Sequence, residues 1–250
     1  MKSFLFIAGC PRSGTSALAH LVSGSEEIIM GMERFGHLVS AEDFKLTPEH
    51  FSKDRFFDVR EEDTFYNDFD KFHSFDKNIY SKFDAAKIVG DKRPDLYLVY
   101  DQLFDKFKDA KLIFIYRNVE DVASSYQGRV AAGNNWPASK DFSKAVLDWN
   151  RSLYFTREAI KKGYSVGCVS YDDVFLSDSS LAPLFDYIDV EMTDSVNIKI
   201  AEIRTIAKRL SEKRVTLLSD SEKEYVNSNA KSFLIGELEP YNILKITSGP

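Results

Sequence analysis

A loop with two glycines, set between an apolar run and an amphipathic run, limits the fold of this chain more than any other feature. Residues 4–8 are continuously apolar, which is typical of a buried parallel strand. The loop runs from Gly9 to Gly14, and apolar residues then recur with helical spacing from 16 to 22. Strand, loop and helix in this order open a βαβ unit. The glycine spacing is that of a P-loop, in which backbone N–H groups at a helix N-terminus cradle phosphate.

The loop departs from the nucleoside-triphosphatase pattern in its own sequence and in the strand expected beside it. Thr15 stands where a lysine normally reaches the outer phosphates of the nucleotide. The strand with the strongest apolar pattern ends in Arg117 and not in a magnesium-binding aspartate. The sequence therefore indicates a phosphate site that is not built for metal-dependent hydrolysis of ATP or GTP. The alternative is a βα turn without a ligand, in which Gly14, Thr15 and Ser16 only cap the helix.

The rest of the chain alternates between apolar strand-like runs and helical patterns. Strands are predicted at 26–31, 87–90, 111–116 and 164–170, and helices at 94–107, from 119, at 143–162 and over most of the chain after 180. A loop rich in Gly, Asn and Pro is predicted at 128–139. We therefore expect residues 1–250 to form a single α/β domain with a central, mostly parallel β-sheet flanked by helices and with a helical C-terminal part.

Residues 40–85 interrupt this alternation with many phenylalanines and tyrosines among charged residues. Phe65, Phe69 and Phe72 follow the i, i+4, i+7 spacing of one helix face. Such a stripe is more often core packing than a ligand contact. We expect a helical, aromatic-rich insertion in the α/β pattern, and insertions of this kind often carry substrate specificity.

Composition excludes several classes of function. The chain has 39 acidic and 33 basic side chains and a formal net charge of −6, with no dense basic block, which argues against a nucleic-acid binder. No run approaches the roughly 20 apolar residues of a transmembrane segment, and the apolar run near Met1 is too short for a secretion signal. Cys10 and Cys168 both lie in apolar runs, so we expect buried, reduced thiols and a cytoplasmic protein.

A second anion site is predicted about a hundred residues after the loop. Arg117 follows the strongest strand, and Ser125 lies in the first turns of the next helix. Because the carboxyl ends of parallel strands meet at one edge of the sheet, Arg117 should lie near the loop. A guanidinium and a hydroxyl together suit a second phosphate. The alternative is an arginine that pairs with Glu120 or Asp121 at the helix start.

At this point the chain resembles a known family, the sulfotransferases that use 3′-phosphoadenosine 5′-phosphosulfate (PAPS). Residues 6–16 look like the family's 5′-phosphosulfate loop, Arg117 to Ser125 look like its 3′-phosphate motif, and residues 169–173 resemble its strand-end segment with a tyrosine beside the adenine. The likeness runs from residue 4 to about 176, without 40–85. It implies that PAPS is the donor, that 3′,5′-adenosine bisphosphate is the product and that no metal is required. The residues it implies for donor binding are Pro11, Arg12, Ser13, Gly14, Thr15, Ser16, Arg117, Ser125 and Tyr171.

Within that family the chain is most similar to the tyrosylprotein-type branch with a Pro-Arg-Ser-Gly-Thr loop. That branch has a glutamate shortly after the first helix, which Glu33 matches, and a segment that residues 90–94 echo. The C-terminal Arg/Lys-Gly-Gly segment of the cytosolic branch is absent. The far side of the 3′-phosphate pocket is therefore unassigned, with weak candidates in Lys208, Arg209, Lys213 and Arg214.

The resemblance implies in-line sulfuryl transfer, in which the protein positions the donor and stabilises charge. We assign Arg12 and Lys92 to that charge stabilisation. Glu33 is the first candidate for the base and His37, one helical turn on, is the second, with Arg34 as a possible partner of the Glu33 carboxylate.

The acceptor is an unidentified molecule with a hydroxyl or an amine: a saccharide, a lipid, a peptide or a small molecule. We expect the segments 40–85 and 128–140, the latter with Trp136, to line its pocket. Two other functions stay open, namely a P-loop kinase of a small molecule or nucleotide, and a nucleotide-binding protein without catalysis.

Overall fold

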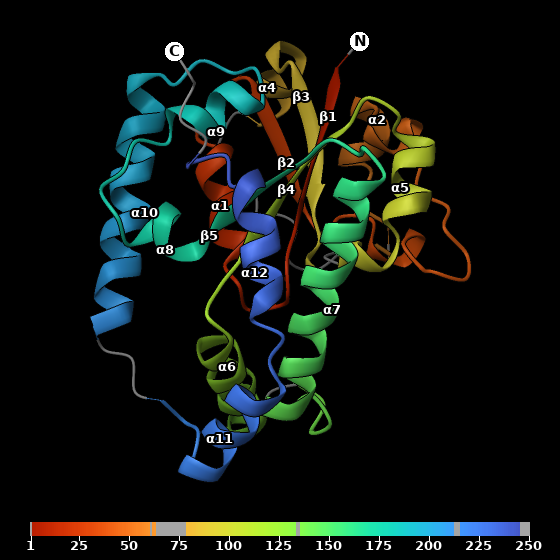
Figure 1. Ribbon diagram of the computed structural model, residues 1–250. Helices are drawn as coiled ribbons and strands as arrows, with labels where there is room; N and C mark the ends of the chain where they lie inside the picture. Colours follow the sequence, from red (N-terminus) through yellow and green to blue (C-terminus); the bar gives the residue numbers. More distant parts are fainter. Residues whose placement is uncertain (1, 61, 64–78, 134–135, 213–215, 246–250) are drawn as a thin grey trace.

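The computed structural model describes residues 2–60, 62–63, 79–133, 136–212 and 216–245 (Figure 1). Five parallel strands form one sheet in the order β2-β3-β1-β4-β5. They are β1 (Ser3–Ala8), β2 (Ile28–Met32), β3 (Ile88–Lys92), β4 (Lys111–Tyr116) and β5 (Val166–Ser170). The strands are almost entirely buried, as continuous apolar runs in a parallel sheet require. The expected α/β class, with a central parallel sheet, is confirmed.

Helices cover both faces of the sheet because the strands present apolar side chains on both faces. Leu5 and Ile7 of β1 face one core, which is completed by α1 (Thr15–Val22), α8 (Tyr171–Phe175), α9 (Ala182–Tyr187) and α10 (Asp194–Glu212). Phe6 and Phe114 face the other core, which is completed by α5 (Tyr100–Lys106), α7 (Phe142–Lys161) and α12 (Phe233–Leu238). The C-terminal part is helical, as expected.

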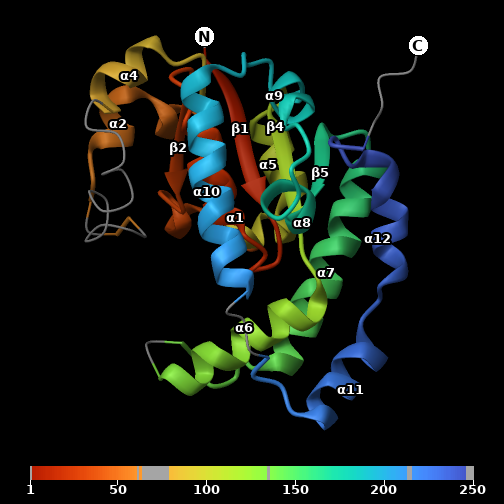
Figure 2. The same ribbon diagram turned by 90° about the vertical axis from the view of Figure 1, so that its left-hand side faces the viewer.

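Two helices extend the fold beyond the carboxyl ends of the strands. In Figures 1 and 2, α6 (Val119–Ala132) and α11 (Asp220–Asn229) lie past the tips of the strand arrows, against the lower part of α7. The predicted loop at 128–139 begins too early, because α6 continues to Ala132. Helix α6 is capped at its C-terminus by Gly133, whose φ of 66° is the left-handed conformation that glycine adopts at little cost.

The predicted helix at 94–107 is also wrong in one respect. It is two pieces, a 3₁₀ helix over Pro94–Leu98 and then α5, because the backbone leaves the helical region at Val99 with a φ of −135°. Two further short 3₁₀ helices lie at Gly36–Leu38 and Glu239–Tyr241.

The aromatic segment 40–85 contributes to the core wherever the structure describes it. It forms a 3₁₀ helix at Pro48–Phe51, followed by α2 (Lys53–Phe57) and α4 (Ile79–Ala85). Phe51 packs edge-to-face on Phe6, with ring centroids 5.8 Å apart, and Phe56 and Phe83 belong to the same buried cluster. These rings are core packing. Phe65, Phe69, Phe72 and His73 lie outside the described residues.

Both cysteines are buried free thiols, as predicted. No helix in the described part of the chain is long and apolar enough to cross a membrane.

Candidate functional site

The loop between β1 and α1 is held in an uncommon backbone conformation. Arg12 and Gly14 have φ values of 73° and 96°, both in the left-handed region, and the Ser13 N–H donates to the Cys10 carbonyl over 3.0 Å. A left-handed arginine costs on the order of 1–2 kcal/mol. Such conformations collect at ligand-binding sites. The Ser13 hydroxyl is buried, and no described group hydrogen-bonds to it, as expected of a side chain that awaits a ligand oxygen.

The N-terminus of α1 supplies the donors of this cradle. Gly14 caps the helix without a side-chain hydrogen bond, and the first helical bond runs from the Leu18 N–H to the Gly14 carbonyl over 3.0 Å. The N–H groups of residues 15–17 precede that bond and have no partner within the helix. Together with the helix dipole they favour an anion. Thr15 and Ser16 place their hydroxyls in the same first turn.

Tyr171, the first residue of α8, closes the loop from the side of β5. A Cβ at Gly14 would lie 2.7 Å from Cδ2 of the Tyr171 ring, so the ring sits directly on the loop. The guanidinium carbon of Arg117 lies 4.1 Å from the centroid of the same ring. The two residues therefore form one stacked unit beside the loop.

The predicted second anion site adjoins the loop. Arg117 follows β4, and its Nη1 donates to the Arg12 carbonyl over 3.3 Å. The Nε of Arg12 in turn donates to the Ser125 hydroxyl of α6 over 3.0 Å. Arg117 also contacts Asp121 at 3.3 Å, so the ion pair that was the alternative for this arginine is present as well. The expectation that Arg117 lies near the loop is confirmed.

Three guanidiniums gather on this side of the loop. Burial, together with the positive charges of Arg129 and Arg117, lowers the pKa of Arg12. Arg129 was not among the residues predicted from the sequence. Its position four residues after Ser125 on α6 puts it on the same helix face, and that spacing could have revealed it. Arg12, Arg117 and Arg129 together concentrate positive charge beside Ser125. Such a cluster suits a multiply charged anion.

Lys92 and Glu33 lie on the opposite side of the loop. Lys92 ends β3 and Glu33 follows β2, and Lys92 is the register partner of both Met32 and Ile7. The Nζ of Lys92 and Oε1 of Glu33 are 2.8 Å apart, with Lys92 nearly buried and the Glu33 side chain 27% exposed. Glu33 has a φ of 60°, another left-handed residue at the site. The prediction that Arg34 could pair with the Glu33 carboxylate is therefore wrong, because Lys92 is the partner of that carboxylate.

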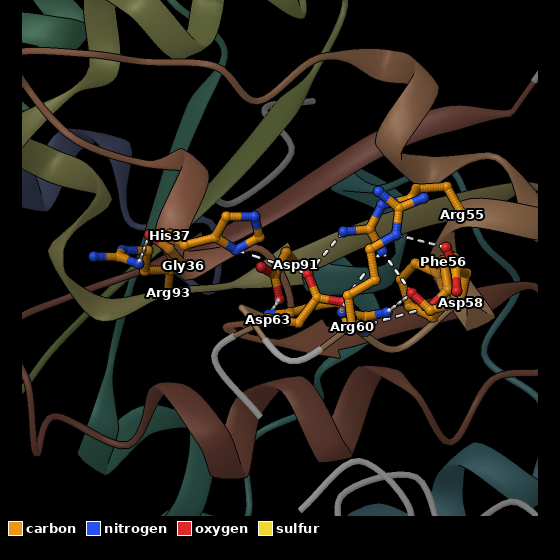
Figure 3. A network of polar contacts seen from close by, with 10 residues as sticks. Gly36, His37, Arg55, Phe56, Asp58, Arg60, Asp63, Asp91 and Arg93 are labelled. Atoms are coloured by element: carbon orange, nitrogen blue, oxygen red, sulfur yellow. Dashed lines mark hydrogen bonds and ion pairs between the residues drawn. The ribbon is translucent and has the colours of Figure 1, made fainter. Parts of the chain in front are cut away.

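Arg34 is instead buried in a network that ties the turn after Glu33 to the segment 55–63 (Figure 3). Its guanidinium donates to the carbonyls of Phe56 and Asp58, each over 3.0 Å, and pairs with the buried carboxylate of Asp63. Its backbone N–H donates to Oδ1 of Asp91 over 3.1 Å. Burial raises the pKa of Asp91 to about 7.

His37 does not stand one helical turn from Glu33, because residues 33–35 form a turn and only Gly36–Leu38 is a 3₁₀ helix. Its Nδ1 lies 3.7 Å from Oδ1 of Asp63, so the ring points into the network of Figure 3. Burial lowers the pKa of His37 despite the nearby carboxylates. The geometry favours Glu33 over His37 as the group beside Lys92.

Of the four C-terminal candidates for the 3′-phosphate pocket, the structure describes two. Lys208 of α10 pairs with Asp178 at 2.7 Å, Arg209 lies one residue further on the same helix, and Lys213 and Arg214 fall outside the described residues. Trp136 packs edge-to-face on Tyr126 of α6.

The family model described as "Sulfotransferase family" matches residues 5–194. No curated protein sequence matches the chain significantly. Among solved structures, the sulfotransferase from Alicyclobacillus acidocaldarius is 16% identical, with a TM-score of 0.56 and coverage of 96% of this chain and 95% of that chain. The sulfotransferase domain from the curacin biosynthetic pathway is 14% identical, with a TM-score of 0.55 and coverage of 91% and 97%. Mouse sulfotransferase SULT7A1 complexed with PAP is 16% identical, with a TM-score of 0.51 and coverage of 94% and 78%.

Proposed function

The chain belongs to the sulfotransferase family, and from this we propose that it is an enzyme that moves a sulfuryl group from PAPS to a hydroxyl or amine of an acceptor. The observation that carries the proposal is the layout of the site. The loop lies in the middle, the Arg12, Arg117 and Ser125 group lies on one side, and the Lys92–Glu33 pair lies on the other. Two separate anion sites suit a nucleotide phosphorylated at two positions.

The residues present fit this donor. The free N–H groups of α1 and the unpartnered Ser13 hydroxyl would hold the 5′-phosphosulfate, with Pro11, Gly14, Thr15 and Ser16 shaping the cradle. Arg117 and Ser125 would hold the 3′-phosphate, and the Tyr171 ring would lie beside the adenine. The mouse structure complexed with PAP supports a donor of this kind. PAPS supplies an activated sulfuryl group on a phosphate leaving group.

The chain's own residues then handle charge and the proton. The Lys92 ammonium, buried beside the loop, stabilises negative charge at the transferring group. The Glu33 carboxylate accepts the proton of the acceptor hydroxyl. Arg12 adds positive charge at the loop, where Arg129 and Arg117 reinforce it. His37 is the second candidate for the base, but its ring faces Asp63.

The test is the release of 3′,5′-adenosine bisphosphate from labelled PAPS, with water as the acceptor until a better one is known. Glu33→Gln should lower turnover roughly 10²- to 10⁴-fold with bisphosphate affinity nearly unchanged. Glu27→Gln is a matched control, because Glu27 pairs with Lys87 at the opposite end of the same two strands and its side chain is equally exposed, at 28%.

Three outcomes would contradict the proposal. Bisphosphate binding without turnover of PAPS would indicate a binding protein without catalysis. Turnover of ATP with Mg²⁺ in place of PAPS would indicate a kinase. Equal losses in Glu33→Gln and Glu27→Gln would remove Glu33 from the chemistry.

A further inference from the structure

We propose that the acceptor is an elongated apolar alcohol, which binds in a cavity along β2 with its hydroxyl at the Lys92–Glu33 pair. This inference rests on the proposed sulfuryl transfer and names the acceptor class. The cavity has a volume of about 440 Å³ and is lined by residues of α1, β2, α4 and α10 and of the turn between α1 and β2. That volume falls within the range of small-molecule binding sites.

The walls of the cavity are apolar over most of their length. Met30 and Met32 of β2 line one side, and Ile203 and Ile206 of α10 line the other. Methionine side chains adapt to varied apolar shapes. A saccharide hydroxyl buried against these four apolar side chains would have no hydrogen-bond partner there, at a cost of about 1–3 kcal/mol for each. An aliphatic or fused-ring skeleton has no such penalty.

The cavity has one polar end and one end at the site. Ser23, Glu26 and Lys82 line the part near the amino end of β2, away from the loop, and α10 adds the polar side chains of Ser195, Lys199 and Glu202 to the lining. From Ile28 to Met32 the strand rises about 13 Å, which sets the length of the occupant. The polar end therefore lies at the outer limit of a ligand whose opposite end reaches the loop.

The inner end of the cavity adjoins the groups assigned to transfer. It is lined by Ala17, His20 and Met32. Met32 is the register partner of Lys92 and directly precedes Glu33. Burial and the charges of Lys92 and Lys199 lower the pKa of His20 to about 4, so this wall stays neutral at pH 7. A hydroxyl at this end would therefore lie beside the Lys92–Glu33 pair.

The position of this cavity changes the expectation for the acceptor pocket. Only Ile79 and Lys82 come from the segment 40–85, and none of its lining residues comes from the described part of 128–140. Most of the lining comes from α1, β2 and α10.

A series of primary alcohols from ethanol to decanol tests the proposal, with labelled PAPS as the donor. Each added methylene should raise kcat/KM roughly fourfold until the cavity is filled, which is the fold-change expected for burial of one CH₂. Glucose and a tyrosine peptide should be poor acceptors. A kcat/KM that does not depend on chain length, or a preference for glucose or the peptide, would overturn the proposal.

A pair of variants on α10 locates the effect in the cavity. Ile206 lines it and is 49% exposed, whereas Leu210, one turn further, is 60% exposed and does not. Ile206→Trp should fill the cavity and abolish the dependence on chain length, while Leu210→Trp should leave it unchanged. Calorimetric binding of decanol without donor should be lost in the first variant only; equal decanol binding in both variants would overturn the proposal.

Failure of this inference differs from failure of the proposed function. If the wild type binds the bisphosphate and releases it from PAPS but transfers to no alcohol, the acceptor class is wrong and sulfuryl transfer stands. If it neither binds the bisphosphate nor turns over PAPS, the proposed function itself is wrong.

Discussion

Asp63→Ala should destabilise the fold strongly, because Asp63 holds the buried network behind the turn that follows Glu33. Its side chain is fully buried and pairs with Arg34, whose side chain is 2% exposed, and with Arg55 at 2.7 Å. It also accepts the Arg60 backbone N–H over 3.0 Å. Removal of one partner of a buried ion pair costs about 3–5 kcal/mol. For a chain of this length that corresponds to a fall in Tm of roughly 6–20 °C.

Urea denaturation at pH 7 measures this loss, with Asp43→Ala as the control. Asp43 pairs with Lys45 at the surface, both side chains 62% exposed, and such pairs contribute about 0–1 kcal/mol. Burial alone would raise the pKa of Asp63, but hydrogen bonds from Arg55, Arg60 and Arg34 outweigh it and lower the value to about 2.

The stabilising contribution of Asp63 is therefore present above about pH 4 and is lost as the pH falls toward 2. The difference between wild type and Asp63→Ala should shrink over that window. An Asp63→Ala variant no less stable than Asp43→Ala would refute the reasoning.

Two further predictions concern the loop and the buried carboxyl behind it. Gly14→Val should abolish bisphosphate binding while the circular dichroism spectrum is retained, because residue 14 has a φ of 96° and an added Cβ would lie only 2.7 Å from the Tyr171 ring. Wild-type affinity of this variant would contradict the prediction. Asp91 has its pKa raised by burial to about 7, against an unfolded value near 4, so its stabilising effect is present below about pH 4 and is lost as the pH rises through 7. The stability of Asp91→Asn relative to wild type should therefore rise between pH 5 and 8, by at most about 1.4 kcal/mol per pH unit, as measured by urea denaturation. Parallel profiles of stability against pH for the two proteins would contradict this prediction.

Local patterns in the sequence were enough to predict the strands and the loop. The apolar run 4–8 and the glycines at 9 and 14 determine β1 and the turn into α1 by short-range effects. The parallel topology then brings Arg117 to the loop, because strands β1 and β4 are neighbours that end at the same edge.

Contacts between distant segments could not be predicted in the same way. The partner of Glu33 depends on the register that sets Met32 against Lys92 across two strands. Arg34 was a possible partner of Glu33 in the sequence, but it is buried because Asp63 and the carbonyls of residues 56 and 58 surround it. The cavity along β2 exists only because α10, about 170 residues further on, packs against α1.

We propose that the loop holds one phosphate of the donor and that Arg117 and Ser125 beside it hold the second, and calorimetric titration with adenosine 3′,5′-bisphosphate and with adenosine 5′-monophosphate tests this most directly. The wild type should bind the bisphosphate roughly 10- to 150-fold more tightly, the contribution of one charge-assisted contact to the 3′-phosphate. Arg117→Ala should erase that preference, while Arg157→Ala, whose arginine pairs with Glu158 and Glu237, should keep it. Equal affinity of the wild type for both nucleotides, or tight binding of ATP with Mg²⁺ and none of the bisphosphate, would contradict the account.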